Sequence, residues 1–152
     1  MNAARAIAVL LAAQVARVEL PAGRFAPLFG LDAGQTSLPV AAFALDVRPV
    51  TRAQFAEFLA TAPEWQRGKA RPPLVDAAYL EGFDAKAQPG APGTNVSWFA
   101  ARAYCAWRGS RLPTTLEWEY AASADETRRD ASRDPAFAQR ITLSRPATWA
   151  RV

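Results

Sequence analysis

Two helix starts, separated by a segment that cannot be helical, constrain the fold of this chain more than any other feature. Ser97 and Thr114 are favourable N-cap residues, and Glu117 follows Thr114 at the spacing of a complete capping box. Between the two caps, Gly109 can adopt the left-handed conformation that ends a helix, and Leu112–Pro113 forces an extended link. The pattern predicts two short helices joined by a tight, non-helical connection.

The second of these helices is expected to run to about Ala124. An earlier helix is predicted from Thr51, which has Gln54 at the capping-box spacing, and Pro63 is expected to end it. One face of this earlier helix carries the apolar residues Phe55, Phe58, Leu59 and Ala62.

Short strands are expected before the first helix. Ala16–Leu20 alternates as a half-buried strand does, Pro21–Gly23 predicts a turn, and Arg24–Ala26 is the expected hairpin partner. Val40–Val47 is mostly apolar and predicts a further strand.

Residues 64–95 are rich in Pro and Gly and predict a long ordered loop, with Trp65, Tyr79, Leu80 and Phe83 as its anchors. Together with the strands and helices, this loop predicts the α+β class: short strands, two or three packed helices and long loops.

The composition excludes several kinds of site. The chain has no His and one Cys, so it cannot form a Ser-His-Asp system, an imidazole metal site, an intrachain disulfide or a zinc cluster. Its 18 basic residues give a net charge of +4 but are spread along the whole length. Because no basic stripe with stacking aromatics is present, we expect no nucleic-acid binding.

The first residues, Met1–Ala16, have the character of a candidate signal peptide. Arg5 precedes the uncharged run Ala6–Ala13, and small residues follow. The run is too short to span a bilayer, so no stable membrane span is expected. This pattern favours a periplasmic or secreted protein; the alternative is a buried first helix or strand in a cytoplasmic one.

Two motifs in order carry a resemblance to a known family. The run Val96–Trp107, VSWFAARAYCAW, and the run Arg111–Ala122, RLPTTLEWEYAA, resemble the paired motifs of formylglycine-generating enzymes, also called sulfatase-modifying factors. Val18–Phe25 and Phe43–Phe58 resemble earlier parts of the same domain. Residues 17–152 are therefore expected to form a partial domain of this family.

The resemblance implies a C-type-lectin-related fold, and an activity that oxidises a protein cysteine to formylglycine during sulfatase maturation. In the family, a cysteine pair near the C-terminus binds Cu(I), as soft thiolates should, and other loops bind calcium. Those motifs lie beyond the residues that match here. We therefore expect a domain that is incomplete at its C-terminus, holds no cofactor in this chain and is not catalytic alone.

The motif residues themselves are expected to be scaffold. Trp98, Tyr104 and Trp118 are predicted to lie in the core, Arg111 to be a buried ion-pair partner, and Glu117 to be a helix cap before anything else. No catalytic residue can be named from the sequence.

Cys105 is expected to be a small buried thiol. The alternative is a disulfide to a second segment or chain, because its position matches a cysteine that some family members use in a structural disulfide. A single thiol with Met1 offers few soft ligands, so we expect no tight stoichiometric Cu(I) binding.

Two other functions fit the pattern. A lectin-like protein-binding module would use residues 64–95 as its binding surface, with a protein partner or a missing C-terminal half as its occupant. An accessory role for a periplasmic copper enzyme such as nitrite reductase is suggested by the likeness of Trp65–Gly68 and Asp125–Asp130 to a bacterial subgroup of the family.

Overall fold

The computed structural model describes residues 15–27, 32–124, 128, 130–131, 134–137 and 139. The chain divides into two units, one of Met1–Val18 with Leu45–Leu112 and the other of Glu19–Ala44 with Pro113–Val152. Helices and short strands are both present, as the α+β prediction requires. Nearly all of the candidate signal peptide, residues 1–14, lies outside the described residues, as does most of Asp125–Asp130.

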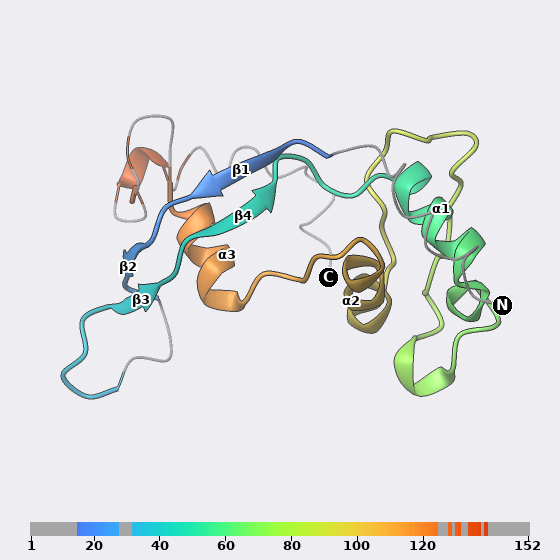
Figure 1. Ribbon diagram of the computed structural model, residues 1–152, viewed down its shortest axis with the longest axis horizontal. Helices are drawn as coiled ribbons and strands as arrows, with labels where there is room; N and C mark the ends of the chain where they lie inside the picture. Colours follow the sequence, from blue (N-terminus) through green and yellow to red (C-terminus); the bar gives the residue numbers. More distant parts are fainter. Residues whose placement is uncertain are drawn as a thin grey trace, which may run out of the picture. The chain divides into compact units, whose positions relative to one another are not determined.

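Within the described residues, four short strands form two two-stranded sheets. β1 (Arg17–Leu20) lies beside β4 (Phe43–Asp46), and β2 (Gly23–Phe25) lies beside β3 (Leu38–Val40), as Figure 1 shows. β2 and β3 are antiparallel, with Gly23 opposite Val40 and Phe25 opposite Leu38.

The expected hairpin between residues 16–20 and 24–26 is wrong, because β1 pairs with β4 rather than with β2. The turn at Pro21–Gly23 shows where the chain leaves β1 but not which strand pairs with it, and both observed pairings join strands farther apart in the chain. The single strand expected at Val40–Val47 is also wrong. Residues 41–42 belong to no strand. They separate β3, which ends at Val40 and pairs with β2, from β4, which pairs with β1.

The first helix, α1 (Arg52–Thr61), begins and ends as its sequence predicts. Thr51 Oγ1 accepts a hydrogen bond from the Gln54 amide, and the Gln54 side chain accepts one from the Thr51 amide, which completes the capping box. The helix gives way to the single 3₁₀ turn η2 (Pro63–Trp65). Pro63 lacks the amide that an α-helix needs at this point.

The next long helix, α2 (Trp98–Trp107), is capped by Ser97, whose Oγ accepts from the Ala100 amide. Gly109 follows it with φ +68°, the left-handed value expected of a glycine that ends a helix. Aromatic rings hold α1 and α2 together. The ring centroids of Phe55, Phe58 and Tyr104 lie 5.4 to 5.8 Å apart, and each of these side chains is at most 3% exposed.

The long loop between α1 and α2 is ordered by its anchors, as predicted. Tyr79 and Leu80 are buried in the same cluster, against which Trp65 and Phe83 also pack. The Tyr79 hydroxyl donates to the Trp65 carbonyl at 2.7 Å, and the Leu80 amide donates to the Asn95 carbonyl at 2.7 Å. A second 3₁₀ turn, η3 (Pro72–Leu74), is the regular structure described inside the loop.

The last part of the loop returns to the start of α1. The amides of Arg52 and Ala53 donate to the carbonyls of Ala91 and Pro89, at 2.8 and 3.0 Å, and the Gly93 amide donates to the Val50 carbonyl at 2.9 Å. These bonds satisfy amides that the first turn of a helix otherwise leaves without a partner.

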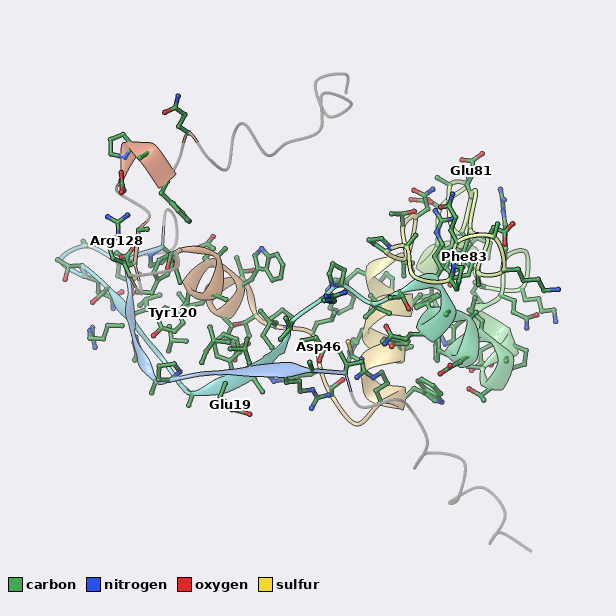
Figure 2. All side chains as sticks on the ribbon, turned by 90° about the horizontal axis from the view of Figure 1, so that it is seen from above. Glu19, Asp46, Glu81, Phe83, Tyr120 and Arg128 are labelled. Atoms are coloured by element: carbon green, nitrogen blue, oxygen red, sulfur yellow. The ribbon has the colours of Figure 1, made fainter. Side chains whose placement is uncertain are left out.

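The other unit is built around α3 (Thr115–Ala122) and the β2–β3 pair. Phe25, Val40 and Tyr120 form its small buried core. The Tyr120 ring meets Phe25 edge-on at 6.2 Å, and its hydroxyl donates to the Pro21 carbonyl at 3.2 Å. Figure 2 shows Tyr120 reaching from the helix towards the strands.

Replacement of Gly23 by alanine is expected to destabilise this unit. A Cβ at this position would lie 2.5 Å from the Tyr120 hydroxyl, and the ring is held by its buried packing. We expect the free energy of unfolding, measured in urea, to fall by about 1 to 3 kcal/mol.

Gly90→Ala is the matched control, because no heavy atom lies within 4 Å of a Cβ there. Adding Tyr120→Phe to Gly23→Ala removes the clashing hydroxyl and should recover part of the loss. An equal effect of Gly23→Ala and Gly90→Ala would show that the close approach to Tyr120 does not matter.

Candidate functional site

A partly buried ion pair ties the end of α2 to the end of β4. The Arg108 side chain is only 9% exposed, and its Nη1 donates to Asp46 Oδ2 at 3.0 Å and to the Tyr104 hydroxyl at 3.4 Å. Asp46 also accepts from Arg17 Nε at 3.1 Å, although that guanidinium is largely exposed. Figure 2 labels Asp46 at the strand end. The sequence reasoning missed this network.

Two features of the sequence are consistent with this network of Asp46, Arg108 and Tyr104. Arg108 follows Tyr104 by one helical turn, so both side chains extend from the same face of the helix. Asp46 is the last residue of β4, where a carboxylate reaches past the end of the sheet. Neither feature predicts that Asp46 pairs with Arg108, because 62 positions separate the two residues.

Cys105 lies beside this network as a free thiol, half-buried where the sequence predicts a buried one. Burial raises its pKa, although the side chain of Ser110 and the charge of Arg108 act in the opposite direction. The nearby Asp46 carboxylate raises it further. The nucleophilic form of a cysteine is the thiolate, so this environment suppresses its reactivity.

Glu117 is buried at 9% exposure and has the capping role predicted for it. Its Oε2 accepts from the Thr114 amide at 2.8 Å, while its own amide donates to Thr114 Oγ1 at 3.2 Å. Ser97, Thr114 and Tyr104 are likewise where the sequence reasoning put them, as two caps and a core ring.

Three other scaffold predictions are wrong. Trp98 and Trp118, expected in the core, are each 58% exposed, and Arg111, expected to be buried, is exposed. Each Trp stands two positions before a buried residue of its helix, Ala100 or Tyr120. Two positions along an α-helix are a turn of about 200°, so the Trp side chains lie on the opposite faces.

Trp98 forms a surface aromatic cluster with its neighbours instead. It meets Phe99 edge-on at 5.2 Å, and the Arg102 guanidinium lies 5.6 Å from its ring centre. Phe99 is itself 42% exposed.

The long loop contributes two adjoining hollows in the unit that contains α1 and α2. One has a volume of about 390 Å³ and the other about 400 Å³, and Arg67 lines both. Figure 2 shows Phe83, which lines the first hollow, on this loop near α1.

Among the described residues, no three Cys, Asp or Glu side chains lie close enough together to bind a metal ion. A search of the same residues for a helix long and apolar enough to cross a membrane found none.

Comparison with known proteins decides the family. The sulfatase-modifying factor enzyme 1-like domain matches residues 12–141, most of the chain. The chain belongs to this sulfatase-modifying factor family. The matched range includes both motif runs, residues 96–107 and 111–122.

Individual relatives of this sulfatase-modifying factor chain differ in their described activity. An inactive C-alpha-formylglycine-generating enzyme 2 from Mus musculus is 34% identical over 146 residues, which is 70% of this chain and 47% of the relative. A formylglycine-generating enzyme from Mycobacterium tuberculosis is 30% identical over 155 residues, 72% of this chain and 52% of the relative. The chain thus spans about half the length of these curated relatives.

A shorter match is to hercynine oxygenase from Mycobacterium tuberculosis, 48% identical over 44 residues, 29% of this chain and 10% of that protein. Proteins named for different reactions therefore share sequence with this chain, so membership of the sulfatase-modifying factor family does not by itself assign a reaction.

Removal of the charge on Asp46 is expected to destabilise the chain. Asp46→Asn leaves the buried Arg108 guanidinium without its charged partner, and the free energy of unfolding in urea should fall by about 2 kcal/mol. Arg17→Ala should cost less than about 1 kcal/mol, because that side chain is 43% exposed. Glu57→Gln, a charge removal on the exposed face of α1, is the matched control. Equal losses for Asp46→Asn and Glu57→Gln would contradict the role of the ion pair.

The raised pKa of Cys105 predicts slow alkylation at neutral pH. In the folded chain the thiolate fraction at pH 7 should be lower than in glutathione, and the difference should disappear as the pH rises above the folded-state pKa. The rate of iodoacetamide labelling as a function of pH tests this, with the chain in urea as the control. A midpoint below that of glutathione would mean that the thiol is activated rather than suppressed.

Proposed function

We propose that this chain provides scaffold elements of a formylglycine-generating type of domain and does not oxidise cysteine on its own. The observation that carries the proposal is the state of its single thiol. Cys105 is half-buried, and its pKa is raised by burial. The whole sequence contains no His that could act as its base.

The donor set of the chain does not fit the copper site that the family resemblance implies. Cu(I) favours two soft ligands held together, whereas the sequence has one Cys and one Met. Cys105 is the one cysteine of the sequence, and the charges that act on its pKa are those of Arg108 and Asp46. No step of the reaction is therefore assigned to residues of this chain.

The remaining motif residues support the same proposal. Ser97, Thr114 and Glu117 cap helices, and Tyr104 fills the core between α1 and α2. The name of the mouse relative, an inactive formylglycine-generating enzyme, is compatible with a family member that keeps the domain without the oxidation.

We further propose that the strands and helices belong to a C-type-lectin-related fold and that the protein acts in the periplasm or outside the cell. Both proposals rest on the sequence motifs and on the composition of residues 1–16. The accessory role for a periplasmic copper enzyme stays a prediction on the same basis.

The scaffold role is tested by offering the chain a cysteine-containing sulfatase-motif peptide together with Cu(I) and oxygen. We expect mass spectrometry to return the peptide unchanged, because no pair of soft ligands is present to hold copper. The Mycobacterium tuberculosis relative, run alongside, controls for adequate peptide, copper and oxygen. Conversion by the wild-type chain that is lost in Cys105→Ala would overturn the proposal and make Cys105 a reacting residue.

A further inference from the structure

The turn at residues 66–70 presents hydrogen-bond donors that the chain does not use. The Gln66 carbonyl accepts from the amides of Lys69 and Ala70, at 3.0 and 3.2 Å, and Gly68 has φ +79°. Within the part of the chain that the structure describes, the amides of Arg67 and Gly68 donate to no acceptor. Adjacent amides left over in such a turn favour an anion.

Arg67 also brings a positive charge to this turn. Its side chain is exposed and makes no hydrogen bond or ion pair with any described residue. Because the residue Arg67 lines both hollows, the hollows adjoin there. A planar guanidinium with free donors is well suited to a carboxylate.

Apolar side chains line the hollows on both sides of Arg67. Leu59, Leu80 and Phe83 line the first, and Val75 and Tyr79 line the second. These walls are preformed, because most of them belong to or pack against the aromatic cluster; the Phe83 ring, for example, lies 6.0 Å from that of Phe55. Each volume falls within the range of small binding pockets.

Each hollow also contains one acidic side chain, and these carboxylates limit where a negatively charged group could bind. Asp84, in the first hollow, already accepts from the amides of Ala87 and Lys86, which lower its pKa. Asp76 lines the second hollow. Both carboxylates repel an anion, so a bound carboxylate should lie at Arg67, with uncharged groups extending into the hollows.

We propose that the Arg67 surface, defined as the residue 66–70 turn with its two hollows, binds an extended segment of a partner protein that carries one carboxylate side chain between two apolar side chains. In an extended segment, alternate side chains lie on one face about 6 to 7 Å apart, so a single face can present all three groups. This binding goes beyond the scaffold role and does not depend on it.

The test uses fluorescein-labelled peptides and the 152-residue chain, with binding followed by fluorescence anisotropy. The probe has the core leucine–serine–aspartate–serine–leucine, and a second peptide replaces its aspartate by asparagine. We expect saturable binding of the aspartate peptide and a loss of about fivefold in affinity for the asparagine peptide, because the ion pair with the exposed Arg67 side chain is lost. A third peptide, with glycine in place of both leucines, should bind more weakly than the probe.

Arg67→Glu is expected to abolish binding of the aspartate peptide. Arg71→Glu is the matched control: Arg71 is an exposed arginine of the same loop that lines neither hollow, and its replacement should change the affinity by less than about threefold. Circular dichroism of both variants should match the wild type, since both side chains are exposed.

Several outcomes would overturn the proposal. They are absence of saturable binding at millimolar peptide, equal affinities for the aspartate and asparagine peptides, and equal affinities of wild type and Arg67→Glu. Equal affinity for the peptide without leucines would also overturn it, since the surface would then bind a small anion and not a polypeptide.

Discussion

The contact of three rings, Phe55 and Phe58 of α1 with Tyr104 of α2, is the interaction on which the larger part of the structure depends. Ring pairs at these separations contribute about 0.5 to 1.5 kcal/mol beyond the area that they bury. The long loop joins the same cluster through Tyr79 and Leu80. Tyr104 also accepts a hydrogen bond from Arg108, so the cluster and the partly buried ion pair support each other.

The features that the sequence predicted well are local ones. A capping box, a proline stop and a left-handed glycine each depend on residues within one turn of a helix, which is why α1 and the boundaries of α2 and α3 were predicted closely. The anchors of the loop were also predictable, because large aromatic residues in a Pro- and Gly-rich segment have few other places to pack.

The features that were missed depend on distant partners or on helix rotation. The pairing of β1 with β4 and the bond from Arg108 to Asp46 join positions far apart in the chain, and no local pattern names such partners. Residue type alone predicts Trp98 and Trp118 in the core, whereas both side chains are exposed in the structure. Their positions relative to Ala100 and Tyr120 would have put them on the outer face.

In the candidate site, too, the local features were predictable from the sequence and the features that depend on distant residues were not. The caps and the core tyrosine were identified from the motifs, and these motifs prove to be structural in the described residues. The sequence indicates residues 64–95 as a candidate binding surface but does not single out Arg67 within that range. The donors of the Arg67 surface are the amides of Arg67 and Gly68, which have no acceptor among the described residues. The sequence does not show which amides lack an acceptor, because that depends on the conformation of the surrounding backbone.

The hydrogen bonds between the start of α1 and residues 89–93 have a consequence for how this protein can change through evolution. They close the long loop at its far end, while Tyr79 and Leu80 hold its middle on the core. The exposed residues 86–88 therefore lie between two fixed points. Added residues there would cost the slowly growing entropy of a longer loop and the local hydrogen bonds from Lys86, Ala87 and Gln88 to Asp84. They would leave both fixed points intact, so this segment can change in length while both helices stay in place.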